Sequence, residues 1–185
     1  MYGSMQISSK RESILKAAAD ILARNPGASF TELAPAIGIS RATLYRHFAQ
    51  REELIRALAM YALHEYDKKM NLIDKQNLPP LEKLKALLGA LLPMGEQFHF
   101  LSKEWEAIDD PEIADIYNRQ SDGLVRLIQA AKDDGSIAQD TPTAWIVQAL
   151  EALIYAAWES VEAGDIARND APSLVYRTLM EGFGV

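Results

Sequence analysis

The segment Ser40–Phe48, with the sequence SRATLYRHF, concentrates polar and basic side chains that could bind nucleic acid. Guanidinium groups bind phosphate oxygens and guanine edges, and hydroxyl and imidazole groups can donate to similar acceptors. Leu44 and Phe48 are four residues apart, so in a helix they would share one buried face. The rest of the helix surface would present Arg41, Thr43, Tyr45, Arg46 and His47. The chemistry of this set is recognition and not catalysis.

Capping signals place this segment directly behind a second short helix. Ser40 is a favoured N-cap, so we expect the later helix to begin at the next residue. Upstream, Ser29 and Glu32 have capping-box spacing, and Gly38 would end the earlier helix in a left-handed turn. Pro35 falls inside the earlier helix and should kink or shorten it, because proline lacks the N–H and clashes with the preceding turn. The pattern is helix, glycine turn, helix.

This order of elements is typical of a helix-turn-helix, whose second helix lies in the major groove with its N-terminal residues at base edges. The residues predicted to read bases are Arg41, Ala42 and Thr43. The residues predicted to face phosphates are Tyr45, Arg46 and His47.

The run from Phe30 to Leu54 resembles the DNA-binding domain of TetR-type (TetR/AcrR) transcriptional regulators. The preceding segment, with Ile14, Ala18 and Leu22, is similar to the first helix of that family. The resemblance implies an all-α fold, with an N-terminal three-helix helix-turn-helix domain (1–52) and a helical ligand-binding and dimerisation domain (53–185). It implies phosphate contacts by Ser29, Thr43, Tyr45 and Arg46, and base contacts by Arg41 and Ala42. It also implies a homodimer, usually a repressor, that binds a small inducer.

The charge is unevenly distributed along the 185 residues. The net charge is −7, which alone argues against a nucleic-acid binder. Residues 1–60, however, hold eight Lys or Arg against five Asp or Glu, whereas residues 61–185 hold eleven against twenty-one. The basic side chains expected to meet phosphate are Lys10, Arg11, Arg41, Arg46 and Arg51. Binding to double-stranded DNA should therefore weaken steeply with salt.

Composition excludes several other classes of protein. The chain has no cysteine, which excludes disulfides and thiolate metal sites, and its longest run without a charged residue is 10 residues, too short for a membrane span. No strand pattern or internal repeat is present. We expect a cytoplasmic protein with no membrane partner.

The remaining chain predicts helices at 51–73, 80–92, 112–132, 142–163 and 172–183, with a further helical stretch from Phe98 to Ile108. In helix 112–132, the residues expected on the inner side are Ile113, Ile116, Tyr117, Leu124, Leu127 and Ile128.

Helix 142–163 is apolar around most of its circumference, so it needs partners on two sides. Its small residues Ala149, Ala152, Ala156 and Ala157 would let another helix approach closely. Together with helix 172–183 it could form a four-helix homodimer interface by two-fold repetition. The alternative is a core helix of a monomer.

Bulky residues in the second part of the chain suit an apolar pocket for an unknown small-molecule inducer. The predicted ligand-binding residues are Met94, Phe98, His99, Trp105, Tyr117, Trp145, Tyr155 and Trp158. The alternative is ordinary core, since aromatic residues at helical spacing are usually buried.

An enzymatic role would depend on Glu96 and His99, whose Glu-x-x-His spacing can supply metal ligands. A di-metal bundle needs a second such motif and two further glutamates, and His64 lacks that spacing. No nucleophile elbow or phosphate-binding loop is present. We therefore expect no enzyme activity, no metal and no cofactor.

These observations favour a homodimeric repressor that a small-molecule inducer releases from a near-palindromic operator. Two alternatives stay open: a helical ligand- or metal-binding protein or enzyme, and a helix-turn-helix module that binds another protein and does not read DNA.

Overall fold

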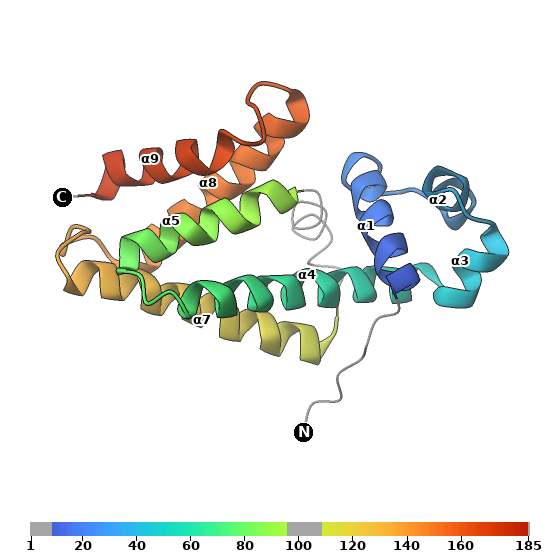
Figure 1. The fold of residues 1–185 in the computed structure, drawn as a ribbon, viewed down its shortest axis with the longest axis horizontal. Helices are drawn as coiled ribbons and strands as arrows, with labels where there is room; N and C mark the ends of the chain where they lie inside the picture. The colour runs from blue at the N-terminus through green and yellow to red at the C-terminus, as the bar shows by residue number, and fades with distance from the viewer. Residues whose placement is uncertain (1–8, 96–108, 185) are drawn as a thin grey trace. The chain divides into compact units, whose positions relative to one another are not determined.

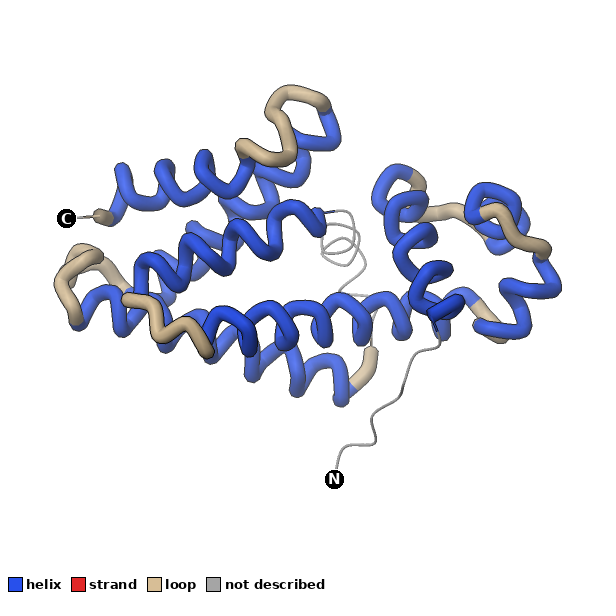
Figure 2. The backbone as a smooth tube through the Cα atoms, viewed as in Figure 1, coloured by secondary structure: helices blue, strands red, loops and turns tan. Residues whose placement is uncertain are grey.

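The computed structural model describes residues 9–95 and 109–184. Throughout these residues the chain is helical, with short connections between the helices (Figures 1 and 2). The elements are α1 (Ser9–Arg24), α2 (Phe30–Ile37), α3 (Arg41–His47), α4 (Arg51–Asp74), α5 (Pro80–Leu91), the 3-10 helix η1 (Leu92–Met94), α7 (Pro111–Asp133), α8 (Thr143–Ala163) and α9 (Ala171–Phe183). The all-α prediction is confirmed.

Local capping explains where most helices begin and end. The expected bounds of α4, α5, α7, α8 and α9 agree with the structure to within one residue. Gly38 follows α2 at φ 82°, and Gly164 follows α8 at φ 81°, both in the left-handed region that glycine adopts without strain. Pro35 does not end its helix, because α2 continues to Ile37. The predicted helical stretch from Phe98 to Ile108 lies outside the described residues.

The described chain divides into two compact units, each with its own core. The first contains residues 9–62 with Asp109 and Asp110, and the second contains residues 63–95 and 111–184. Helix α4 therefore contributes its first half to one unit and its second half to the other.

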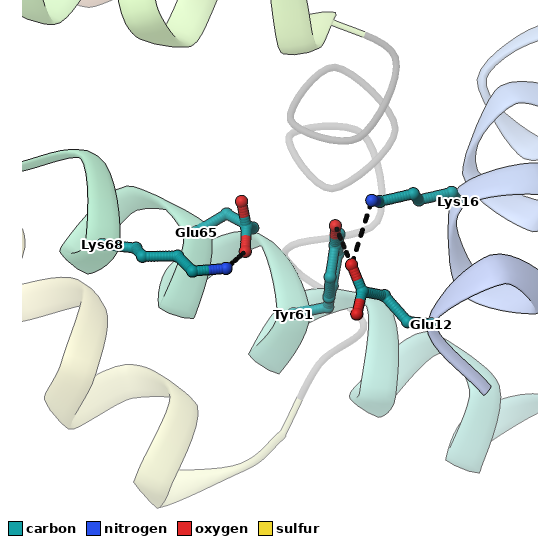
Figure 3. Close-up of polar contacts among 5 residues, drawn as sticks. All are labelled: Glu12, Lys16, Tyr61, Glu65 and Lys68. Atoms are coloured by element: carbon teal, nitrogen blue, oxygen red, sulfur yellow. Dashed lines mark hydrogen bonds and ion pairs between the residues drawn. The ribbon is translucent and has the colours of Figure 1, made fainter. Parts of the chain in front are cut away.

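The core of the first unit joins α1, α2, α3 and the start of α4. Its largest fully buried side chains are Leu15, Leu22, Leu33, Leu44, Phe48 and Leu54. Polar contacts at its edge connect α1 to α4: the Tyr61 hydroxyl donates to Glu12 Oε1 at 3.5 Å, and Lys16 Nζ lies 3.0 Å from the same oxygen (Figure 3). The bond to Glu12, followed by contact with Tyr61, raises the pKa of Lys16. The Glu12 carboxylate thus binds both Lys16 of α1 and Tyr61 of α4 at the edge of this core.

The core of the second unit is formed by α5, α7, α8 and α9 with η1. Its buried residues include Leu84, Leu88, Ile128, Ile146, Leu150, Val175 and Leu179. Lys132 is buried as well, and its ammonium donates to the Thr141 carbonyl at 2.5 Å, across the connection from α7 to α8. This bond compensates part of the cost of placing a charge in the interior.

Helix α7 is also bound to the second half of α4. Gln120 Nε2 donates to the Leu63 carbonyl and to Asp67 Oδ1, both at 2.9 Å, and Arg119 Nη2 donates to Asp67 Oδ2 at 3.1 Å. Burial, and then the charges of Asp67 and Asp74, raise the pKa of Tyr66 to about 12. These contacts fix the register of α7 on α4.

The predicted inner side of α7 is partly wrong. Ile113, Leu127 and Ile128 are buried as expected, but Tyr117 is 40% exposed. Burial, and then the charge of Glu151 on α8, raise the pKa of Tyr117, and burial raises the pKa of Glu151. Tyr117 therefore lies at the margin between α7 and α8, which helical periodicity alone does not distinguish from the core.

A close contact between Gly95 and Trp158 gives a testable prediction. A Cβ atom at position 95 would lie 2.7 Å from Trp158 Cδ1 and 3.1 Å from its Nε1. Because the rigid indole must move to admit a methyl group, Gly95→Ala should lower the free energy of unfolding by about 1–3 kcal/mol. Urea unfolding followed by circular dichroism and tryptophan fluorescence measures this change.

Gly89 is the matched control for this prediction. It lies in α5 with no neighbouring atom within 4 Å of the added Cβ. Gly89→Ala should raise the free energy of unfolding by about 0.5–1 kcal/mol, since alanine is the better helix former. Equal unfolding midpoints for Gly95→Ala and Gly89→Ala would contradict a close contact between Gly95 and Trp158.

Candidate nucleic-acid interface

Helix α3 is held in place by its N-cap and by two buried side chains. The Ser40 hydroxyl accepts a hydrogen bond from the Thr43 N–H at 3.1 Å, so the helix begins at Arg41 as predicted. Leu44 and Phe48 are fully buried. The orientation of α3 about its own axis is therefore set by its apolar side.

The opposite side of α3 is open to solvent. It exposes Arg41, Ala42, Tyr45 and Arg46. The Tyr45 side chain is 53% exposed, and its ring packs edge-on against Phe30 of α2 with 5.1 Å between centroids. This contact holds the phenol in place while leaving its hydroxyl free to meet a phosphate.

Two predicted contact residues are less available than the sequence suggested. Thr43 is half-buried, and its hydroxyl lies 2.9 Å from Ser40 Oγ, so it is already hydrogen-bonded within the cap. His47 is also half-buried, and its Nε2 is enclosed without a hydrogen-bond partner among the described residues. Thr43 and His47 are therefore less exposed than the other three polar residues of α3, and their contacts with DNA stay a prediction.

Ser29 occupies the N-cap of α2 as the capping box predicted. Its N–H and its hydroxyl both donate to Glu32 Oε2, at 2.9 and 2.8 Å. These two bonds stabilise the carboxylate and lower the pKa of Glu32. Ser29 is exposed, so the start of α2 is accessible to a phosphate.

The five basic residues predicted to meet phosphate fall into two groups. Arg11 lies over the Phe48 ring, 4.8 Å from its centroid, and 3.8 Å from Glu53 Oε1. Arg51 donates to the Pro26 carbonyl. Lys10, by contrast, is exposed together with the arginines of α3. Arg11 and Arg51 thus stabilise the unit itself, a role that composition could not separate from phosphate binding.

The predicted ligand-binding residues are spread over different environments. Met94 and Trp158 are half-buried, whereas Tyr117, Trp145 and Tyr155 are 40%, 58% and 42% exposed. Phe98, His99 and Trp105 lie outside the described residues. Glu151, next to Tyr117, was not singled out from the sequence, because nothing in its spacing distinguishes it from other surface glutamates.

Residues 9–95 and 109–184 hold no group of three or more His, Cys, Asp or Glu side chains able to bind a metal ion. Over the same ranges, no helix has the length and apolar character to cross a membrane.

A family model described as bacterial regulatory proteins, tetR family, matches residues 14–58, which cover most of α1 and all of α2 and α3. The chain is 26% identical over 172 residues to the HTH-type transcriptional repressor LfrR of Mycolicibacterium smegmatis, a match that covers 93% of this chain and 89% of LfrR. It is 31% identical over 100 residues to the nucleoid occlusion factor SlmA of Vibrio cholerae, covering 52% of this chain and 50% of that protein.

Two solved structures share the fold over almost the whole chain. One is LfrR from Mycobacterium smegmatis in complex with proflavine, with a TM-score of 0.76 and 25% identity, covering 93% of this chain and 94% of that one. The other is the ketosteroid transcriptional regulator KstR2 of Mycobacterium tuberculosis, with a TM-score of 0.78 and 21% identity, covering 97% of each chain. The helix-turn-helix geometry, the family match and the LfrR likeness agree, and they indicate a transcriptional regulator and not an enzyme. Residues 14–58 thus match the tetR family of bacterial regulatory proteins, and the chain as a whole is similar to a transcriptional repressor with this fold.

Proposed function

We propose that this regulator is a homodimeric repressor that inserts α3 of each protomer into the major groove of a near-palindromic operator. The observation that carries the proposal is the division of α3 into a fully buried apolar side and an exposed side bearing Arg41, Ala42, Tyr45 and Arg46. Two such helices related by a two-fold axis would read half-sites about 34–36 Å apart.

Helix α8 supports the homodimer. One side of α8 enters the core of its own unit through Ile146, Val147 and Leu150. The other side is exposed although it is rich in apolar and small residues, namely Trp145, Ala152, Tyr155 and Ala156. A second copy of the chain would cover this surface, and the alanines would allow two α8 helices to approach closely, with α9 completing a four-helix interface.

The ligand site is proposed in the second unit, at the half-buried Met94 and Trp158 and at Tyr117, which is 40% exposed. Trp145 and Tyr155 lie on the exposed side of α8 together with Ala152 and Ala156, which favours a place for them in the dimer interface over the lining of a pocket. The carboxylate of Glu151 lies near Tyr117, a combination that would attract an aromatic or other organic cation. Proflavine, which is bound in the LfrR structure, is an aromatic cation and the first compound to test as an inducer.

Selection of random double-stranded DNA on the purified protein, at two salt concentrations, tests the proposed function. A two-fold symmetric site whose retention falls steeply with salt is the expected result. Recovery of no symmetric sequence at either salt would overturn operator reading and favour a helix-turn-helix that binds another protein. Addition of proflavine to the selected complex then tests release by an organic cation.

Single substitutions on α3 should separate affinity from specificity. Arg46→Ala and Tyr45→Ala should each weaken binding to all duplexes, and Arg46→Ala should also reduce the slope of log affinity against log salt by about 1. Arg41→Ala should relax preference at one position of each half-site, by about 1–3 kcal/mol. Fluorescence anisotropy with labelled duplexes measures both effects.

The control for these variants is Arg126→Ala, which removes an exposed arginine from α7 in the second unit. It should leave operator affinity unchanged. If the α3 variants bound as tightly as this control, α3 would not be the recognition helix.

A further inference from the structure

A side-chain contact across the turn of the helix-turn-helix joins α2 to the first residue of α3. Arg41 Nη1 donates to the Thr31 hydroxyl oxygen at 3.5 Å. Both side chains are exposed, so the contact lies on the surface that would face DNA and not in the core. Its length marks it as a weak hydrogen bond that can direct a guanidinium without immobilising it.

Pro35 adds a second acceptor at the same residue. In an α-helix the carbonyl of residue 31 would receive the N–H of residue 35, but proline has none. The Thr31 carbonyl therefore lacks its helical donor, although α2 continues past Pro35 to Ile37. Thr31 thus offers two acceptors, its hydroxyl oxygen and its carbonyl oxygen. Both can accept a hydrogen bond from a guanidinium group.

The two exposed arginines of α3 differ in this respect. Arg46 is exposed and makes no hydrogen bond or ion pair within the described residues, so none of them fixes the direction of its guanidinium, which suits a phosphate contact. Arg41 is directed by Thr31. Its remaining N–H groups form the planar fork that matches guanine O6 and N7. Ala42, the next residue, is too small to obstruct the approach of a base edge.

We propose that Thr31 is a positioning residue that holds the Arg41 guanidinium for reading a guanine in each operator half-site. This inference rests on the proposed function, since it needs α3 to lie in the major groove. It assigns base specificity to a residue of α2 that itself need not touch a base.

The experiment compares the base preference of variants at every position of the selected operator. The position read by residue 41 is the one whose preference disappears in Arg41→Ala. At that position we expect guanine in the wild-type site, favoured by about 5- to 150-fold over other bases. Thr31→Val keeps the shape of the side chain but removes its hydroxyl, and should reduce the guanine preference by about 3- to 10-fold at this position alone.

Thr31→Ser provides the rescue, because it restores the hydroxyl and should return the guanine preference to within about 2-fold of wild type. Thermal unfolding of Thr31→Val should match wild type, since valine and threonine have similar helix propensities and residue 31 is exposed. A preference lost by misfolding would instead appear at every position and would not return with serine.

The outcomes distinguish failure of the proposed function from failure of the positioning role of Thr31. If the wild-type protein selects no symmetric site, the proposed function fails and this inference fails with it. If a symmetric site is selected but the Arg41-dependent position is not guanine, or Thr31→Val keeps the full guanine preference there, operator reading stands and the positioning role of Thr31 is overturned.

Discussion

Phe48→Ala should unfold the first unit more readily than any other single truncation on α3, lowering its free energy of unfolding by about 3–5 kcal/mol. Phe48 is fully buried at the C-terminal end of α3, and the Arg11 guanidinium lies over its ring. Truncation would leave a cavity between α1 and α3 and would remove the cation–π contact. Because α3 has only seven residues, little else holds its orientation.

Urea unfolding followed by circular dichroism, with hydrogen exchange to resolve the two units, measures this loss. Exchange should accelerate in α1–α3 and stay slow in α7 and α8. Phe48→Leu, which keeps most of the apolar volume, should be clearly less destabilising, and Arg46→Ala, at an exposed position, should change stability by no more than about 0.5 kcal/mol. A loss below about 1 kcal/mol for Phe48→Ala would contradict the central place of this ring.

Ala156→Glu should convert the proposed homodimer into monomers. The substitution places a carboxylate on the exposed, small-residue side of α8, where two copies of the helix would meet. An unpaired charge in a desolvated interface weakens association by at least about 100-fold, which corresponds to about 2.7 kcal/mol. Operator affinity should fall by about 100- to 10,000-fold, because each protomer then binds its half-site alone.

Size-exclusion chromatography with light scattering gives the oligomeric state, and anisotropy gives the operator affinity. The matched control is Ala114→Glu, which introduces the same charge at an exposed alanine of α7. This variant should stay dimeric and bind the operator. A dimeric Ala156→Glu protein would show that copies associate through another surface.

The elements that sequence reasoning predicted well are those fixed by local chemistry. Ser40 caps α3 and Gly38 ends α2 because both effects act within one turn of the chain. Leu44 and Phe48 were assigned to the core from their spacing alone, and both are buried. The helix-turn-helix could therefore be predicted almost to the residue.

Features that depend on contacts between distant residues were not predictable in the same way. Arg51 binds the carbonyl of Pro26, which is 25 positions away, and Arg11 lies over the ring of Phe48. From composition both looked like free phosphate ligands. Thr31 was passed over because its significance comes only from its distance to Arg41 in the folded unit.

The reactivity of Lys132 can report local unfolding of the second unit. In the described part of the chain it is the one charged residue that is buried, and its amine is bound to the Thr141 carbonyl. An amine-acylating reagent would modify the exposed Lys68 and Lys85 in the native protein but would reach Lys132 only after the connection between α7 and α8 separates. The extent of labelling at Lys132 would thus measure how often this region opens in the native protein, without any engineered probe.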